Sequence, residues 1–276
     1  MIQRILSFVA YFLRGLLLSV TGLFYIIVTL VYWNIFFDPG QQTPDIENYM
    51  LVIGVFGTAM TFLVTLTVAV QANRAHNLPL VVRLPSRVEY LTAVLVASLI
   101  FSLLMQLMLA LLALYRGPDL TAGRVLEIPP IWLAVDILAA VLAMHASDFV
   151  TAGWSRTTIY GILAILLFGQ SADGTVTDWL ALRAGTLART FISRGWISLG
   201  TTLTSFSNWL GSVGDGALTR AMDFVFWPFK AIADAVLTGF FDPAQALAPA
   251  ILLLYATVLF LLAADLFASK DLEFIE

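Results

Sequence analysis

The sequence predicts an all-α, polytopic membrane protein with about six spans and additional amphipathic helices at the membrane interface. Hydrophobic residues make up 60% of the 276 positions and charged residues only 12%, whereas soluble domains average about 25% charged residues. Several apolar runs approach or exceed the length of about 20 residues that a helix needs to cross the hydrocarbon core. Because a helix satisfies its own backbone polar groups, we expect one transmembrane domain, residues 1–276, built from helices.

The predicted spans follow directly from the apolar runs. In chain order they are residues 16–37, 49–70, 90–115, 131–146, 157–168 and 246–264. The first three contain no charged residue, the fourth contains Asp136 and His145, and the fifth is short.

Positive charges predict the orientation, because short cytoplasmic loops carry an excess of Lys and Arg. With six spans, one side of the membrane receives a set of basic residues: Arg4, Arg14, Arg74, Arg83, Arg87, Arg156 and Lys270. The other side receives the acidic loop 38–47 and a charge-balanced loop around Arg116. We therefore expect both termini in the cytoplasm and no cleaved signal peptide at the N-terminus.

Residues 171–244 form a region of different character. A stripe at alternating spacings of four and three predicts amphipathic helix: Ile192, Trp196, Leu199, Leu203, Phe206, Leu210, Val213 and Ala217. Trp179, Trp196, Trp209 and Trp227 are typical of segments resting at the interface. Gly195, Gly200, Gly211 and Gly214 predict broken helices, and Pro228 predicts a further break or bend. We expect a helical cap or a re-entrant hairpin here, with a substrate-binding domain as the alternative; five basic residues in it fit the orientation poorly.

Many kinds of chemistry are excluded by what the chain does not contain. It has no cysteine and only two histidines, so no thiolate nucleophile and no cysteine or histidine-rich metal site is predicted. It also contains no phosphate-binding loop of the P-loop type. The net charge of −4 gives no basic surface for nucleic acid. We expect no catalytic residue and no metal or cofactor in this chain, which is then not an enzyme by itself.

Asp136 and His145 are the ionisable residues inside the predicted spans. They are nine residues apart, which places them on opposite faces of a helix and excludes a direct proton relay between them. Asp136 lies only about one and a half turns inside its span. We expect an interfacial carboxylate solvated by headgroup water, with a functional intramembrane group as the alternative.

Small and polar residues follow one face of each of two predicted spans. The second span carries Gly54, Thr58, Thr61 and Thr65, with Gly57 beside them, and the third carries Ser98, Ser102 and Gln106 at intervals of four. Such residues let helix backbones approach closely or form hydrogen bonds between helices. A packing or dimer seam is the favoured interpretation, and a conduit is the alternative.

The loop between the second and third predicted spans, residues 72–89, carries a local motif. Its end and the start of the next span contain Arg83, Pro85, Ser86, Arg87, Glu89, Tyr90 and Leu91. This segment resembles the cytoplasmic loop of ABC-2 type transporter permeases. Prolines at 79 and 85 make the loop a rigid charged knob outside the membrane. The knob either docks with a soluble ATPase, as the resemblance implies, or anchors to anionic headgroups.

The resemblance implies a wider set of expectations. Residues 1–14 would be an interfacial N-terminal helix, and the subunit would work as a dimer in a prokaryotic inner or plasma membrane, with spans one, two and five near the seam. A separate ATPase subunit would bind ATP and Mg²⁺ and dock on Arg74, Arg83, Pro85, Ser86, Arg87 and Glu89. The alternative is a scaffold or assembly subunit of a larger membrane complex. An ion-coupled secondary transporter ranks last, because the sequence shows neither paired charges near the midplane nor an inverted repeat.

Overall fold

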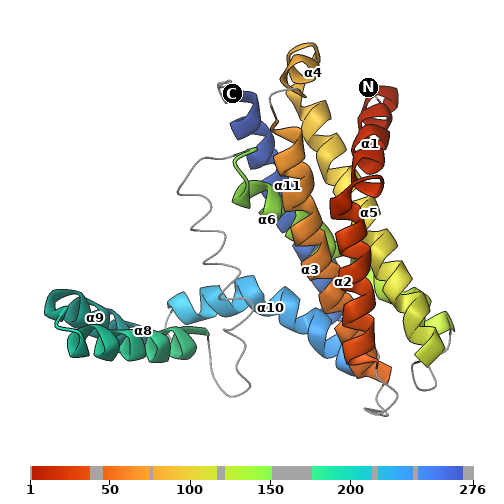
Figure 1. Ribbon diagram of the computed structural model, residues 1–276. Helices are drawn as coiled ribbons and strands as arrows, with labels where there is room; N and C mark the ends of the chain where they lie inside the picture. Colours follow the sequence, from red (N-terminus) through yellow and green to blue (C-terminus); the bar gives the residue numbers. More distant parts are fainter. Residues whose placement is uncertain are drawn as a thin grey trace. The chain divides into compact units, whose positions relative to one another are not determined.

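The computed structural model describes residues 2–37, 46–74, 77–116, 122–150, 176–212, 217–238 and 242–269. These residues form helices and turns, with no strand among them (Figure 1), so the predicted all-α class is confirmed for this part of the chain. The elements in chain order are α1 (Ile2–Leu17), α2 (Val20–Phe36), α3 (Ile46–Ala72), α4 (Leu78–Val82), α5 (Arg87–Arg116), α6 (Ala122–Ala146), α8 (Val176–Ser193), α9 (Ile197–Ser212), α10 (Ala217–Thr238), η2 (Gln245–Leu247) and α11 (Ala248–Ser269). The chain divides into two units, Met1–Thr157 with Ala231–Glu276, and Thr158–Lys230.

Among the residues that the structure describes, three helices are long and apolar enough to cross a membrane. They are Tyr49–Ala72 with 24 residues, Arg87–Tyr115 with 29, and Gln245–Ser269 with 25. The helices α1 and α2 would make a fourth if this bent pair is one span, and the apolar part of α6, Ile131–Ala146, is shorter. The predicted fifth span at 157–168 lies outside the described residues.

The predicted first span, residues 16–37, is wrong at its start because the helix breaks there. α1 ends at Leu17, α2 begins at Val20, and the two are bent by 68°. The Ser19 hydroxyl accepts a hydrogen bond from the Gly22 N–H at 3.1 Å and donates one to the Leu16 carbonyl at 2.7 Å. A Cβ at position 22 would collide with that carbonyl oxygen, so the sharp bend needs glycine. Ser19 is thus the N-cap of α2.

The first unit contains a helix bundle. α3 packs against α5 and α6, α11 packs against α6, and α1 packs against α5. Aromatic and aliphatic side chains such as Ile53, Tyr90, Phe101 and Leu109 are fully buried in it. The start of α1, the short helix α4 and the end of α11 lie at the same end of this bundle (Figure 1), where the Arg87 guanidinium donates to the Ala268 carbonyl at 3.2 Å.

The second unit contains a hairpin of α8 and α9, which lie side by side. The predicted break at Gly195 is confirmed: this residue has φ of 82°, a backbone conformation that favours glycine, and it lies in the turn between the two helices. The predicted stripe is therefore divided: Ile192 belongs to α8, the stripe residues within 199–210 to α9 and Ala217 to α10, while Val213 lies outside the described residues. Gly200 lies inside α9 and makes no break there; its missing side chain leaves room for Ile192 of α8.

Pro228 does not break its helix. α10 runs continuously from Ala217 to Thr238 with the proline inside it, so of the predicted break or bend, the break is wrong and the bend stays a prediction. Proline removes one backbone donor, and a helix of 22 residues retains hydrogen bonds on both sides of the affected turn.

Candidate functional site

The N-terminal helix α1 is attached to the rest of its unit by an apolar face. Val9, Phe12 and Leu16 are buried on that face. The ring of Tyr90, at the start of α5, receives edge contacts from Phe8 and Phe12, each with ring centroids 5.5 Å apart. The Tyr90 hydroxyl also donates to the Ala72 carbonyl at the end of α3, over 3.0 Å. One buried tyrosine therefore connects α1, α3 and α5.

Two polar contacts add to this apolar attachment. The Arg4 guanidinium forms an ion pair with Glu89 at 3.1 Å; the arginine side chain is 48% exposed and the glutamate side chain 7%. The Tyr11 hydroxyl donates to Asn77 Oδ1 at 3.1 Å, and the Asn77 amide donates to the Gln71 carbonyl at 2.9 Å. α1 is thus held to both ends of the loop that carries α4.

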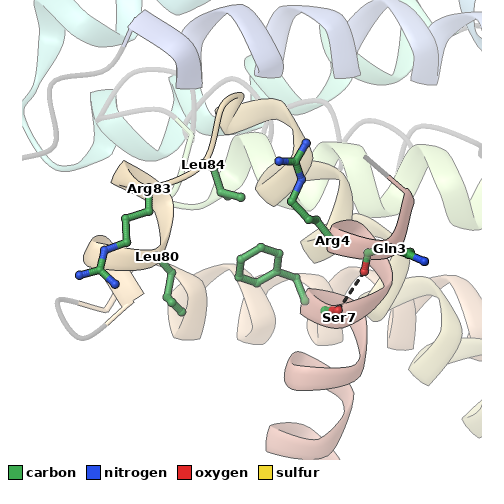
Figure 2. A pocket seen from close by; sticks show the side chains of 7 residues that line it. Gln3, Arg4, Ser7, Leu80, Arg83 and Leu84 are labelled. Carbon is green, nitrogen blue, oxygen red and sulfur yellow. Dashed lines mark hydrogen bonds between the residues drawn. The ribbon is translucent and has the colours of Figure 1, made fainter.

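A groove lies between α1 and the segment that follows α4. Its volume is about 480 Å³, and its lining comes from Gln3, Arg4, Ser7, Phe8, Leu80, Arg83 and Leu84. Figure 2 shows Gln3, Arg4 and Ser7 on α1 and Leu80, Arg83 and Leu84 across the groove, with the Arg83 guanidinium pointing away from α1 and the Ser7 hydroxyl donating to the Gln3 carbonyl. Arg4 is already paired with Glu89, so the Arg83 guanidinium and the apolar side chains give the groove a chemistry suited to acidic and apolar side chains of a partner.

The structure separates the predicted docking residues into two groups. Arg74, Arg83 and Pro85 are exposed, as a docking surface requires. Ser86, Arg87 and Glu89 serve contacts within the chain. The Ser86 hydroxyl accepts from the Val88 N–H at 3.3 Å at the start of α5, Arg87 bonds the Ala268 carbonyl, and Glu89 pairs with Arg4.

Sequence reasoning missed Arg4, Phe8 and Tyr11 as members of this region. The available signal was their spacing, because residues 4, 8, 11 and 12 lie on one face of a helix. Their partners on the loop were not readable, since Arg4 and Glu89 are 85 positions apart in the sequence.

The predicted small and polar residues of α3 and α5 lie inside the bundle. Gly54, Thr61, Thr65, Ser98, Ser102 and Gln106 are buried, and Thr58 is partly buried. Thr65, Ser98 and Ser102 donate to carbonyl groups of their own helices, at 2.7, 2.8 and 3.0 Å. These three hydroxyls are thereby satisfied without a partner on another helix.

Asp136 is placed differently from the prediction. It is fully buried, and the Thr58 hydroxyl donates to its Oδ1 at 2.8 Å. The expectation of a carboxylate solvated by headgroup water is therefore wrong. Asp136 lies near the end of its predicted span, but α3 packs against α6 there and covers the side chain. His145 lies away from it, with its Nε2 at 2.9 Å from the Leu259 carbonyl of α11.

In the described part of the chain, no group of three or more His, Asp or Glu side chains could hold a metal ion. The groove at the α4 end and the polar group around Asp136 are the features that offer chemistry. No protein-family model, no curated protein and no solved structure matches this chain.

Proposed function

We propose that this chain is the membrane-spanning permease subunit of an ABC-2 type transporter, working as an exporter. In this proposal it has six spans with both termini in the cytoplasm and forms a dimer with a second permease copy. ATP and Mg²⁺ bind to a separately encoded ATPase subunit, so the chain itself carries no catalytic residue.

The observation that carries the proposal is the arrangement around α4. A short helix, Leu78–Val82, stands between two long apolar helices, α3 and α5, at the end of the bundle where α1 begins. Arg83 and Pro85 are exposed beside it, and the groove described above adjoins it. A rigid, basic projection at one end of a bundle is the shape that a soluble partner with an acidic cleft would recognise.

The contacts of α1 suggest how movement of a bound partner would reach the spans. Displacement of α4 acts on Asn77, which holds Tyr11 of α1, and on the start of α5, where Glu89 holds Arg4. Because α1 continues into α2 through the bend at Ser19, a shift of α1 also changes the angle between α1 and α2. The loop that carries α4, the helix α1 and the apolar helices α2, α3 and α5 would then move together.

The test is an affinity purification of the tagged chain from its native membranes in mild detergent, with ATP hydrolysis assayed on the eluate. Wild type is compared with Arg74→Glu/Arg83→Glu, which reverses two exposed charges and leaves the internal contacts of Arg87 and Glu89 intact. The matched control is Arg189→Glu, an exposed arginine on α8 in the other unit. We expect ATP hydrolysis to co-purify with wild type and with the control, and to be lost with the double variant. Absence of an ATP-hydrolysing partner from the wild-type eluate would contradict the proposal.

A scaffold or assembly subunit is the second candidate, and the α8–α9 hairpin favours it. Large apolar side chains are exposed along this hairpin: Leu182, Leu187, Trp196, Ile197, Leu199, Phe206 and Trp209. Such a surface suits a membrane interface or another membrane subunit. In the same purification, recovery of integral membrane proteins without ATP hydrolysis would support this candidate over the permease.

A further inference from the structure

The interior of the bundle contains a polar group that docking with an ATPase does not use. Asp136 of α6 is fully buried, and its described hydrogen bond is the one from the Thr58 hydroxyl of α3 to Oδ1. Its second carboxyl oxygen, Oδ2, has no hydrogen-bond partner within the described residues. A buried polar atom of this kind costs free energy unless something satisfies it.

Three neighbouring side chains share this property. Both atoms of the Gln106 amide on α5, the Trp132 indole N–H on α6 and the Thr61 hydroxyl on α3 lack a hydrogen-bond partner among the residues that the structure describes. Gln106 and Thr61 are each 1% exposed, and Trp132 is 6% exposed. Buried side-chain polar atoms usually have a partner, which can be bound water, so this cluster has unused hydrogen-bonding capacity.

Two glycines of α3 show that these groups lie at one level of the bundle. A Cβ at Gly57 would collide with Gln106 Nε2, and a Cβ at Gly54 would collide with the indole ring of Trp132. Gly57 adjoins Thr58, the partner of Asp136. Gly54 precedes Thr58 by four residues on α3, as Trp132 precedes Asp136 on α6. The polar atoms of α3, α5 and α6 therefore gather within about one or two helical turns.

No basic side chain on the apolar stretches around Asp136 can balance its charge. Residues 50–72 of α3, 91–114 of α5 and 248–264 of α11, the helices packed against α6, contain no Lys, Arg, His, Asp or Glu. The titratable or charged groups of these elements lie at their ends or farther along: Glu47 and Tyr49 on α3, Arg87, Glu89, Tyr90, Tyr115 and Arg116 on α5, Tyr255 and Asp265 on α11, and Arg124, Glu127 and His145 on α6 itself. Within these apolar stretches of α3, α5, α6 and α11, Asp136 is therefore the one carboxyl group.

A charged carboxylate in apolar surroundings is costly unless a positive charge accompanies it. A metal ion fits poorly, because the described residues hold no group of three or more carboxylate or imidazole ligands and the Trp132 N–H is a donor that a cation repels. A proton requires no coordination shell. We propose that Asp136, Thr58 and Gln106 form a proton-binding site inside the bundle, where the Asp136 carboxyl group binds and releases one proton.

Gln106 is the positioning residue of this site. Its amide offers one acceptor and two donors. In the structure the Gln106 amide has no hydrogen-bond partner among the described residues. In the proposed site it turns toward Asp136, so that its carbonyl oxygen accepts from the protonated carboxyl group and its NH₂ donates to the carboxylate once the proton leaves. Thr58 donates to the carboxyl group in both states, and the Trp132 N–H is a further donor for the charged form.

Infrared difference spectroscopy of the full-length chain in lipid nanodiscs tests the site without any ATPase partner. The pH is stepped with ¹³C-aspartate-labelled and unlabelled protein, and the carbonyl band of a protonated carboxyl group is followed. The chain has other aspartates, so we expect wild type to show, besides their bands, one labelled pH-dependent band from the buried Asp136. Asp136→Asn loses the band, while Asp265→Asn, at an exposed position of α11, retains it.

Gln106→Leu gives an independent readout, which also serves if Asp136→Asn does not fold. It should keep the labelled band but shift its frequency and its titration midpoint, because the amide partner is gone. A wild-type protein without a pH-dependent aspartate band would overturn the proposal, as would a band unchanged in Asp136→Asn or in Gln106→Leu. Stabilisation of wild type by Na⁺ at constant pH, absent from Asp136→Asn, would assign a cation site in place of the proton site. Failure of the permease proposal affects none of these spectra.

Discussion

The α3–α5–α6 bundle and the α8–α9 hairpin use similar residues for different purposes. Both are rich in glycine, serine and threonine, and in both some hydroxyls bond carbonyl groups of their own helix, as Thr65 and Thr186 do, while Thr58 and Ser207 bond groups of a neighbouring helix. In the bundle, the space beside Gly54 is filled by Trp132 from another helix, whereas nothing lies within 4 Å of the position where Gly211 would carry a Cβ. Small residues therefore act as packing sites only where a neighbouring helix occupies the space.

Both regions expose large apolar side chains, Leu63 and Leu104 in the bundle among them, but the bundle also buries a large set of them. Phe101 of the bundle is fully buried, with its ring 6.0 Å from that of Tyr25, while Leu199 of the hairpin is 54% exposed. The bundle gains stability from contacts within the chain. The hairpin leaves its apolar side chains available to a membrane interface or a partner.

The largest expected effect comes from removing a core ring of the bundle. Phe101→Ala should lower the free energy of unfolding by about 3–5 kcal/mol, because it removes buried contacts and leaves a cavity. Leu199→Ala should change it by no more than about 0.5 kcal/mol. Unfolding in mixed micelles of mild detergent and dodecyl sulfate measures both. Equal losses would mean that the hairpin is packed as tightly as the bundle.

A glycine substitution tests the same comparison at smaller scale. Gly54→Ala should lower the free energy of unfolding by about 1–3 kcal/mol, since the new methyl group meets the ring of Trp132. Gly211→Ala has open space and should not destabilise. Combining Gly54→Ala with Trp132→Leu should cost less than the two single changes added together. Additive losses in this cycle would show that the two residues do not touch.

The turn of the hairpin provides an intermediate case. Gly195→Ala should cost about 1 kcal/mol, because alanine is strained at a φ of 82°. The loss should appear in the same unfolding measurement and should not depend on Phe101. Gly15, which has nothing within 4 Å and no unusual φ, is the matched control position.

The ion pair at the α1 end should have the smallest effect. Arg4→Gln should cost about 0.5–1 kcal/mol, because Arg4 is half-exposed and solvent weakens the pair. Arg4→Gln/Glu89→Gln should recover part of this loss, since the buried glutamate charge is removed as well. Arg189→Gln on α8 should be neutral. A loss of several kcal/mol in Arg4→Gln would show that the pair is a main support of α1.

The helices that were predicted best are the unbroken apolar ones. Residues 49–70 and 90–115 correspond to Tyr49–Ala72 and Arg87–Tyr115, because lipid-length runs without charge leave little choice of structure. The break before α2 was missed, since Leu16, Leu17, Leu18 and Val20 are all apolar. Ser19 and Gly22 carried the signal, as an N-cap and a residue without a side chain.

The candidate docking loop was only partly predictable. Arg83 and Pro85 are exposed as expected, but Arg87 and Glu89 turn toward Ala268 and Arg4, which are 181 and 85 positions away in the sequence. Local pattern identifies a basic loop. It does not identify which of its charges meet another part of the same chain.

By itself the sequence determined that this chain is helical and has segments of membrane-spanning length, because hydrophobicity and backbone hydrogen bonding act locally along each run. Only the tertiary structure decided that Asp136 is buried against Thr58, with Gln106 and Trp132 lying against glycines of α3 at the same level. The environment of a carboxyl group depends on which helices cover it. Which helices cover it depends on packing between segments far apart in the chain, and a local sequence pattern does not predict that packing.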